Sequence, residues 1–315
     1  RPWGDYPLYA TPAPDYPAGA AEGDSVYTGP ETTTVHEFPA DGSGRDIVYY
    51  AVMAEDMAGN VGPVATGGQA RTTSYRVGDI GGDGGAPGDG AIAAADLARL
   101  DPTLGRERGE AGFDAECDVA PADSAGPVIP VPDALIDLDD LMLVAMRHDH
   151  VGVAAPAGDL QAALEWAIVG DDTLVVTLAD TCRSLKGLSV VADGGAANWT
   201  LLPGDLLTDQ PGPWFLSQGL GGCRAYLAVL GPEVGLEGTG ELLRLVADQT
   251  VTVSDVELAA RDIHNAPLDA ITVAVSDDPT LPAAFRALPP YPNPFNTTTT
   301  IAFALSDRQT VRMDI

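Results

Sequence analysis

Apolar and polar residues alternate over short stretches along most of this chain, which is the pattern of β-strands with one buried face. The clearest case is the run IVYYAVMAE, residues 47–55, in which successive side chains point to opposite sides. The residues that follow, DMAGN, are typical of a turn, because Gly59 and Asn60 accept positive φ. Val61 and the residues after it can return beside the first run. The sequence therefore predicts a β-hairpin here.

The second half of the chain repeats the alternation at regular intervals, between turns rich in Gly, Pro and Asp. It is cleanest in TLVVTL, residues 173–178, and no long helical period interrupts it. Regularly spaced short strands of this kind predict a β-sandwich. The expected strands are Leu164–Ile168, Leu174–Leu178, Leu188–Ala192, Tyr226–Leu230, Glu241–Ala247 and Val251–Leu258.

Several aromatic residues lie outside the expected strands. Trp199 and Trp214 fall in loop-like stretches of the second half. Such side chains could form a platform for a sugar, since they combine a flat apolar ring with a polar edge. We expect them instead to pack inward and anchor their loops. The same two interpretations apply to a group near the start of the chain: Trp3, Tyr6, Tyr9 and Tyr16.

Residues 76–149 break the β pattern and contain a duplication. Each half runs from spaced aspartates through a D-G or D-A step to an isoleucine, a further aspartate and an amphipathic run. Loops of oxygen ligands followed directly by a helix are typical of calcium-binding units. The apolar residues of the two runs recur at helical spacing: Leu97 and Leu100 in the first, and Leu141, Val144 and Ala145 in the second.

The first half matches positions 5 to 12 of a 12-residue calcium loop with the octapeptide DGAIAAAD, residues 89–96. Gly90 fits the sharp turn at position 6, and Ile92 should point into the core. The distance in sequence from Asp79, the first ligand, exceeds that of an ordinary loop by six residues. The expected ligands are Asp79, Gly81 or Asp83 near position 3, Asp89, the carbonyl of Ala91, and Asp96.

The second half matches the same positions with DALIDLDD, residues 133–140. Here Ala134 replaces the usual glycine of the turn, and the loop is eleven residues longer than an ordinary one. The expected ligands are Asp118, Asp133, the carbonyl of Leu135, Asp137 and Asp140. A simpler alternative is that these acids only cap helices, since Asp is a good N-cap residue. The duplication favours Ca²⁺.

The charge balance agrees with a cation ligand. The chain has 46 acidic and 16 basic residues, giving a net charge of −30. Such a surface repels nucleic acid and anionic membranes, so we expect neither as a partner. It suits a secreted protein that binds divalent cations, and halophilic adaptation is the alternative. No apolar run approaches the roughly 18 residues of a membrane span.

No catalytic pattern stands out. The four histidines are scattered, and neither H-E-x-x-H nor G-x-S-x-G occurs. The spaced carboxylates are already assigned to metal, so we expect no enzyme activity from this chain. The cysteines fit no metal pattern. Cys182 and Cys223 could pair or remain two buried thiols, and Cys117 is left over.

The duplicated pattern D-G-x-I-x-x-x-D-L resembles the type I dockerin, a small calcium-binding α domain of secreted polysaccharide-degrading assemblies. The resemblance implies two calcium loop–helix units and a protein partner of cohesin type. It also implies that loop positions 10 and 11 take part in recognition. These positions hold Ala94-Ala95 in the first repeat and Leu138-Asp139 in the second, and neither pair is the Ser-Thr seen in many dockerins.

Three further stretches resemble known modules. Tyr-x-Val-x-Ala followed by DMAGN resembles the end of a fibronectin type III module. GLEGTGELLRL, residues 235–245, and GLSV, residues 187–190, resemble strands of cohesin modules. YPNPFN, residues 291–296, before a Thr-rich run resembles the start of the immunoglobulin-like C-terminal sorting domain of type IX secretion. For the dockerin-like and cohesin-like parts we expect two modules side by side. Packing in cis and head-to-tail assembly are the alternatives.

These interpretations give a mainly β chain of successive β-sandwich modules with a small α, EF-hand-like unit between them. The expected divisions are 1–75 (truncated fibronectin type III-like), 76–150 (dockerin-like), 151–158 (linker), 159–276 (cohesin-like), 277–287 (linker) and 288–315 (start of the sorting domain). We expect an internal fragment of a longer extracellular or cell-surface bacterial protein. Its function would be calcium-dependent attachment linked to polysaccharide breakdown, with polysaccharide itself a further candidate ligand. The alternative is the accessory tail of a glycoside hydrolase or peptidase whose catalytic domain precedes residue 1.

Overall fold

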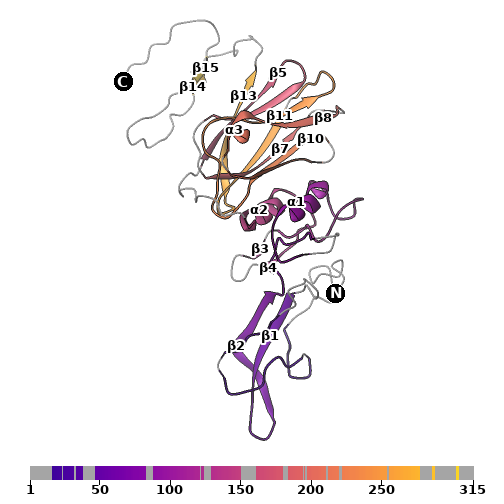
Figure 1. The fold of residues 1–315 in the computed structure, drawn as a ribbon, viewed down its shortest axis with the longest axis vertical. Coiled ribbons are helices and arrows are strands. Elements are labelled where there is room, and N and C mark those ends of the chain that lie inside the picture. Colours follow the sequence, from indigo (N-terminus) through magenta and orange to yellow (C-terminus); the bar gives the residue numbers. More distant parts are fainter. Residues whose placement is uncertain are drawn as a thin grey trace, which may run out of the picture.

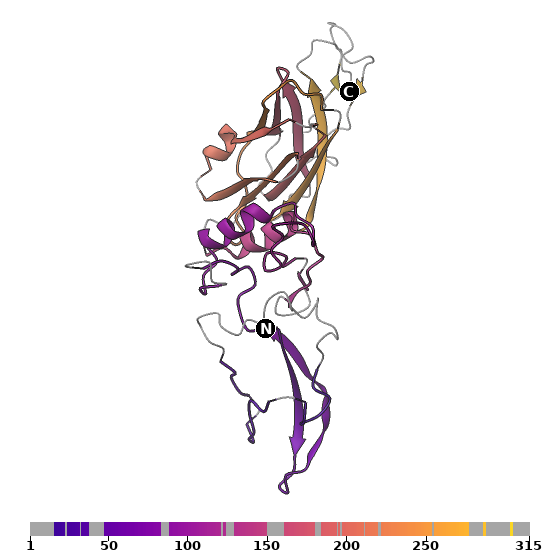
Figure 2. The same cartoon turned by 90° about the vertical axis from the view of Figure 1, so that its right-hand side faces the viewer.

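The computed structural model of this chain describes residues 16–22, 24–31, 33–37, 47–82, 88–120, 122–123, 129–149, 161–179, 184–193, 195, 197–210, 212–219, 222–253, 255–276, 286–287 and 303–304. The fold class is mainly β, as predicted. A β-hairpin, a unit of two short helices and a β-sandwich follow one another along the long axis of the molecule (Figures 1 and 2). None of the helices in the described residues is long and apolar enough to cross a membrane.

The predicted hairpin is confirmed. β1 (Ile47–Glu55) pairs in antiparallel fashion with β2 (Val61–Thr73). The connecting turn is closed by a hydrogen bond of 3.0 Å from Asp56 N to Asn60 O, and Gly59 has the positive φ of 84° that the turn requires. Tyr16 packs edge-on against Tyr49, with 5.2 Å between the ring centres. Trp3, Tyr6 and Tyr9 lie outside the described residues.

The sandwich consists of nine strands in the hydrogen-bonded order β8-β11-β6-β5-β13-β12-β7-β10-β9. The long strand β13 joins its two sheets, because it pairs with β12 at its start and in parallel with β5 over the rest. The strands are β5 (Gln161–Val169), β6 (Thr173–Leu178), β7 (Leu185–Ala192), β8 (Trp199–Pro203), β9 (Trp214–Gln218), β10 (Cys223–Val229), β11 (Gly240–Ala247), β12 (Val256–Asp262) and β13 (Pro267–Ser276), with the short helix α3 (Asp205–Thr208) before β9.

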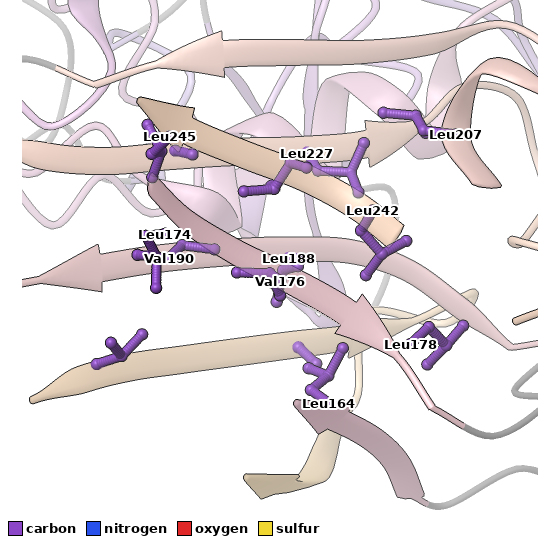
Figure 3. Packing of buried hydrophobic residues seen from close by; sticks show 14 of the residues in the cluster. Leu164, Leu174, Val176, Leu178, Leu188, Val190, Leu207, Leu227, Leu242 and Leu245 are labelled. Atoms are coloured by element: carbon purple, nitrogen blue, oxygen red, sulfur yellow. The ribbon is translucent and has the colours of Figure 1, made fainter. Parts of the chain in front are cut away.

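The core of the sandwich is made of aliphatic side chains from both sheets. Alternation supplies them: in β6, Leu174, Val176 and Leu178 are buried and the residues between them are not. They meet Leu188 and Val190 of β7 across the sandwich (Figure 3). Burial of side chains of this size stabilises the fold by about 1.5–3 kcal/mol each. The predicted sandwich architecture for this half of the chain is therefore present.

Two details of the sequence prediction were wrong. Trp199 and Trp214 begin strands β8 and β9 rather than lying in loops. Each strand is five residues long, too short for its alternation to stand out from the Gly and Pro turns beside it. Trp199 is buried in the sandwich core, and Trp214 is partly buried against the same core, so neither forms an open platform. The strand expected at Val251–Leu258 begins only at Val256.

The two-helix unit contains α1 (Ala94–Leu100), the 3-10 turn η3 (Asp101–Thr103) and α2 (Leu138–Arg147). The five apolar residues of the two predicted helical runs are buried, and so is Ile92. The inserted stretch of the second half holds the small ribbon β3 (Ala122–Asp123) and β4 (Ile129–Pro130). Ile129 packs with Ile47 and Tyr49 at the base of the hairpin.

Some predictions fall largely outside the described residues. Of the stretch that resembles a sorting domain, only β15 (Phe303–Ala304) is described, paired with β14 (Arg286–Ala287). Cys182 is outside the description, while Cys223 and Cys117 are buried free thiols. Burial raises the pKa of Cys223 to about 12 and raises that of Cys117 further. Neither thiol is therefore a ready thiolate.

Candidate functional site: duplicated loops and a helix–sheet interface

The first predicted loop is closed by its aspartates. The carboxylate of Asp79 accepts hydrogen bonds of 3.0 Å from the amides of Asp89 and Gly90. Asp96, at the start of α1, reaches back to the beginning of the loop. Its Oδ1 accepts from the amides of Ile80 at 2.6 Å and Gly81 at 2.8 Å, and its Oδ2 from Ala93 at 2.7 Å. The amide of Ala91 donates to Asp89 at 3.0 Å.

The second loop repeats this network residue for residue. Asp118 accepts from the amides of Asp133 at 3.2 Å and Ala134 at 3.0 Å. Asp140 Oδ1 accepts from Val119 at 2.6 Å and Ala120 at 2.8 Å, and Oδ2 accepts from Asp137 at 2.9 Å. One further bond completes the match, since Leu135 N donates to Asp133 at 3.0 Å. The bond of 2.8 Å from Asp139 N to Asp137 is found only in the second loop, because Ala93 stands at the equivalent of Asp137. The predicted duplication is thus a structural one.

Each loop is also tied to the segment that follows the other helix. The amide of Gly105, after α1, donates to the carbonyl of Ile136 at 2.7 Å. In the same way, the amide of Asp149, after α2, donates to the carbonyl of Ile92 at 2.8 Å. Asp149 also forms an ion pair of 2.7 Å with Arg76, which lowers the pKa of Asp149. Both isoleucines are fully buried, so the two halves form one unit.

The turn at position 6 has the same conformation in both halves but holds a different residue in each. Gly90 has φ of 86°, as predicted for this position, and Ala134 adopts nearly the same conformation with φ of 75°. A side chain with Cβ is strained there. We expect Ala134→Gly to raise the free energy of unfolding by about 1 kcal/mol. The matched change Gly90→Ala should lower it by a similar amount, which chemical denaturation of both variants will check. Small and equal changes in the free energy of unfolding at the two sites would contradict the strain expected for alanine at position 6.

The described residues supply oxygen atoms of the type that calcium prefers, but they do not converge on one point. No group of three or more acidic, His or Cys side chains in the described part of the chain could hold a metal ion. Asp83 lies outside the description. Of the described residues, those counted as position 3 directly from the first ligand are Gly81 in one loop and Ala120 in the other, and neither has a side-chain oxygen. Calcium binding by the predicted residues therefore stays a prediction.

The buried acids are held by amides. Asp79, Asp96, Asp118 and Asp140 are between 1 and 3% exposed, whereas Asp89 and Asp133 are exposed. Burial raises the pKa of Asp96 and raises that of Asp140 well above its usual range, while the amide hydrogen bonds act in the opposite direction. These four carboxylates thus organise the loops from within.

The two-helix unit lies on the outer face of the sheet β12-β7-β10-β9, which we call the docking face (Figure 1). Strand β10 is buried on both sides. Its residues Ala225 and Leu227 point into the sandwich core, while Tyr226 and Ala228 belong to the core of the two-helix unit. Phe215 of β9 and Ala259 of β12 join the same cluster. The expectation of two modules merely side by side was therefore wrong, because they share a buried face.

Helix α2 contacts the docking face most closely. A Cβ atom added at Gly187 of β7 would lie 2.2 Å from Met142 Sδ and 3.4 Å from Leu138 Cδ1. Asp139 forms an ion pair of 2.8 Å with Arg261 of β12, and both side chains are mostly shielded from solvent. The amide of Gly231 donates to Ala145 O at 2.9 Å.

A further contact comes from the end of α1, where Ser217 Oγ donates a hydrogen bond to Asp101. The two repeats nevertheless meet the sandwich unequally. Leu138 and Asp139, at loop positions 10 and 11 of the second repeat, lie at the interface. Their equivalents Ala94 and Ala95 are exposed. Only the second repeat thus carries the pair of residues that the docking face engages.

Sequence reasoning identified the loops but missed the sandwich side of the interface, chiefly Gly187, Tyr226 and Arg261. One signal was available. The run CRAYLAV, residues 223–229, is apolar at nearly every position, which is typical of a strand buried on both faces. Its partner surface could not be read from the sequence, because Arg261 and Asp139 are 122 residues apart.

Comparisons with known proteins gave structural similarity to cohesin modules. No family model matches the chain, and no curated protein matches it. A non-cellulosomal cohesin from the archaeon Archaeoglobus fulgidus is 15% identical, with 38% of this chain and 94% of that chain covered and a TM-score of 0.26. The sixth cohesin of scaffoldin B from Acetivibrio cellulolyticus, solved in complex with the Cel5 dockerin, is 11% identical (37% and 97% covered, TM-score 0.26). A cohesin–X-dockerin complex of the same organism is 8% identical (37% and 96% covered, TM-score 0.27).

Proposed function

We propose that this chain is a non-catalytic attachment region of a secreted or cell-surface protein, in which a dockerin-like unit is docked in cis on a cohesin-like sandwich. The observation that carries the proposal is the shared buried face between α2 and the docking face. It joins residues that resemble dockerin loops to a sandwich that contains the cohesin-like stretches 187–190, in β7, and 235–245, which leads into β11. The pair would act as a stiff joint between the modules on either side.

The contacts of the joint support a fixed arrangement. Met142 is fully buried, and the Asp139–Arg261 pair lies beside it at 22–32% side-chain exposure. A buried apolar centre with a charged pair at its edge combines affinity with a defined orientation. The fibronectin type III-like hairpin before the joint and the sorting-domain resemblance after it extend the proposal to a multimodular surface protein. The dockerin resemblance supports polysaccharide breakdown as its context.

A charge-reversal cycle tests the docking. Asp139→Arg and Arg261→Asp should each place like charges together and lower the free energy of unfolding by about 1 kcal/mol. The double variant should recover most of that loss, because the pair is restored in reverse. Thermal and urea unfolding of the full chain will measure this. Additive losses in the double variant would contradict the contact.

The state of the full chain tests the cis arrangement itself. Since the docking face is already covered within one chain, we expect a monomer at all accessible concentrations in sedimentation velocity experiments. Concentration-dependent oligomers would instead indicate that the two-helix unit of one chain docks on the sandwich of another. Release of sugars from polysaccharides by the purified chain would overturn the non-catalytic assignment.

A further inference from the structure

The two calcium-loop-like segments contain a feature that an ordinary metal loop would not need. The last acidic position, Asp96 or Asp140, uses its carboxylate to hold the first residues of its own loop. Each accepts three backbone amides: Ile80, Gly81 and Ala93 in the first loop, and Val119, Ala120 and Asp137 in the second. In a calcium loop the residue at position 12 would instead be a bidentate ligand of the cation.

Two of the three amides that each carboxylate binds belong to positions 2 and 3, and the third belongs to position 9. Counted directly from the first ligand, position 3 holds Gly81 in the first loop and Ala120 in the second, and neither residue has a side-chain oxygen for a cation. Glycine or a single methyl group lets the backbone at this position approach the carboxylate closely. A Cβ at Gly81 would lie 2.3 Å from Ala95 O, so this approach depends on glycine in the first loop. In both loops, the residue counted as position 3 thus offers the carboxylate an amide and offers a cation no side-chain oxygen.

We propose that both loops are closed by these carboxylate–amide contacts and that the two-helix unit folds without calcium. In a calcium loop the cation links the start of the loop to the start of the helix. Here the carboxylates of Asp96 and Asp140 make that link through hydrogen bonds to backbone amides. Each amide that a buried carboxylate accepts offsets part of the free-energy cost of burying it. Asp79 and Asp118 hold the turn at positions 5 and 6 in the same way. This inference does not depend on the proposed docking in cis.

The first test compares the full chain in millimolar calcium and in EGTA. We expect the same melting temperature, within about 1 °C, and equal protection from hydrogen exchange for the amides of Ile80, Gly81, Val119 and Ala120. Isothermal titration with calcium chloride should show no binding. A calcium-dependent rise in melting temperature of about 5 °C or more, or loss of protection in EGTA, would overturn the proposal.

A matched pair of variants separates the two mechanisms. Asp140→Asn replaces one accepting oxygen of the residue that holds three amides with an NH2 donor, whereas Asp133→Asn changes an exposed predicted ligand that accepts one local amide. We expect Asp140→Asn to lower the melting temperature by about 5 °C or more, equally in calcium and in EGTA. Asp133→Asn should have little effect in either. If calcium holds the loop, both variants will abolish a calcium response and neither will matter in EGTA, which would refute the proposal.

Discussion

Gly187→Leu should separate the two-helix unit from the sandwich. Any side chain at this position of β7 would occupy the space of Met142, which is fully buried and whose Sδ lies 2.2 Å from the place a Cβ would take. Overpacking of this kind costs about 1–3 kcal/mol. We expect residues 76–149 to melt before the sandwich and to lose hydrogen-exchange protection. The sandwich core should survive, since its aliphatic residues form a separate cluster.

The controls for this prediction lie within the same chain. Gly62→Leu places the same side chain in a strand where the nearest atom to a Cβ is Ala54 O at 3.5 Å, so it should be tolerated. Met142→Ala removes the obstructing side chain, and the double variant with Gly187→Leu should regain part of the lost docking. A single unchanged melting transition for Gly187→Leu would show that α2 does not rest on the sheet as described.

The parts of this fold that could be predicted are those encoded locally. The D-G-x-I-x-x-x-D-L pattern placed Asp96 and Asp140 at helix starts and Ile92 in the core, because loop and helix are consecutive in sequence. Ile136, the counterpart of Ile92 in the second loop, is buried as well. Ala134 was recognised as the exception at the turn, yet it adopts the left-handed conformation all the same. The surrounding hydrogen bonds, including the one from its own amide to Asp118, impose that conformation.

The pairing across the interface could not be predicted, because its residues, apart from the apolar run of β10, carry no local signal. A glycine inside a strand, such as Gly187 in β7, usually only weakens the strand and does not by itself indicate a packing partner. Only the folded structure shows that Met142 lies against it. Arg261 and Asp139 each have the sequence context of a solvent-exposed charge. The sequence also did not determine the function of the acidic loops. Spacing predicts which aspartates lie together, but it does not distinguish a carboxylate that binds a cation from one that binds amides.

Lys186→Met should destabilise the sandwich more than any surface substitution, by about 3 kcal/mol. Lys186 is the single lysine of the chain and is fully buried in β7. Its ammonium donates to three carbonyls beyond β7: Val229 at 2.8 Å, Gly231 at 2.6 Å and Val234 at 3.0 Å. Methionine has nearly the same length but no donor, so it would leave these carbonyls unsatisfied. Urea unfolding will measure the loss, and a change below 1 kcal/mol would contradict this role.

The pH dependence gives an independent check on the same residue. Burial lowers the pKa of Lys186 to about 8, against about 10.4 in an unfolded chain. Between these values the unfolded state holds more protons than the folded state, so the lysine's contribution to stability rises with pH and is smallest below about pH 8. The stability difference between the wild type and Lys186→Met should therefore widen from pH 8 to pH 10. A difference that stays constant over this range would mean that the ammonium keeps its ordinary pKa, held charged by its three carbonyl partners.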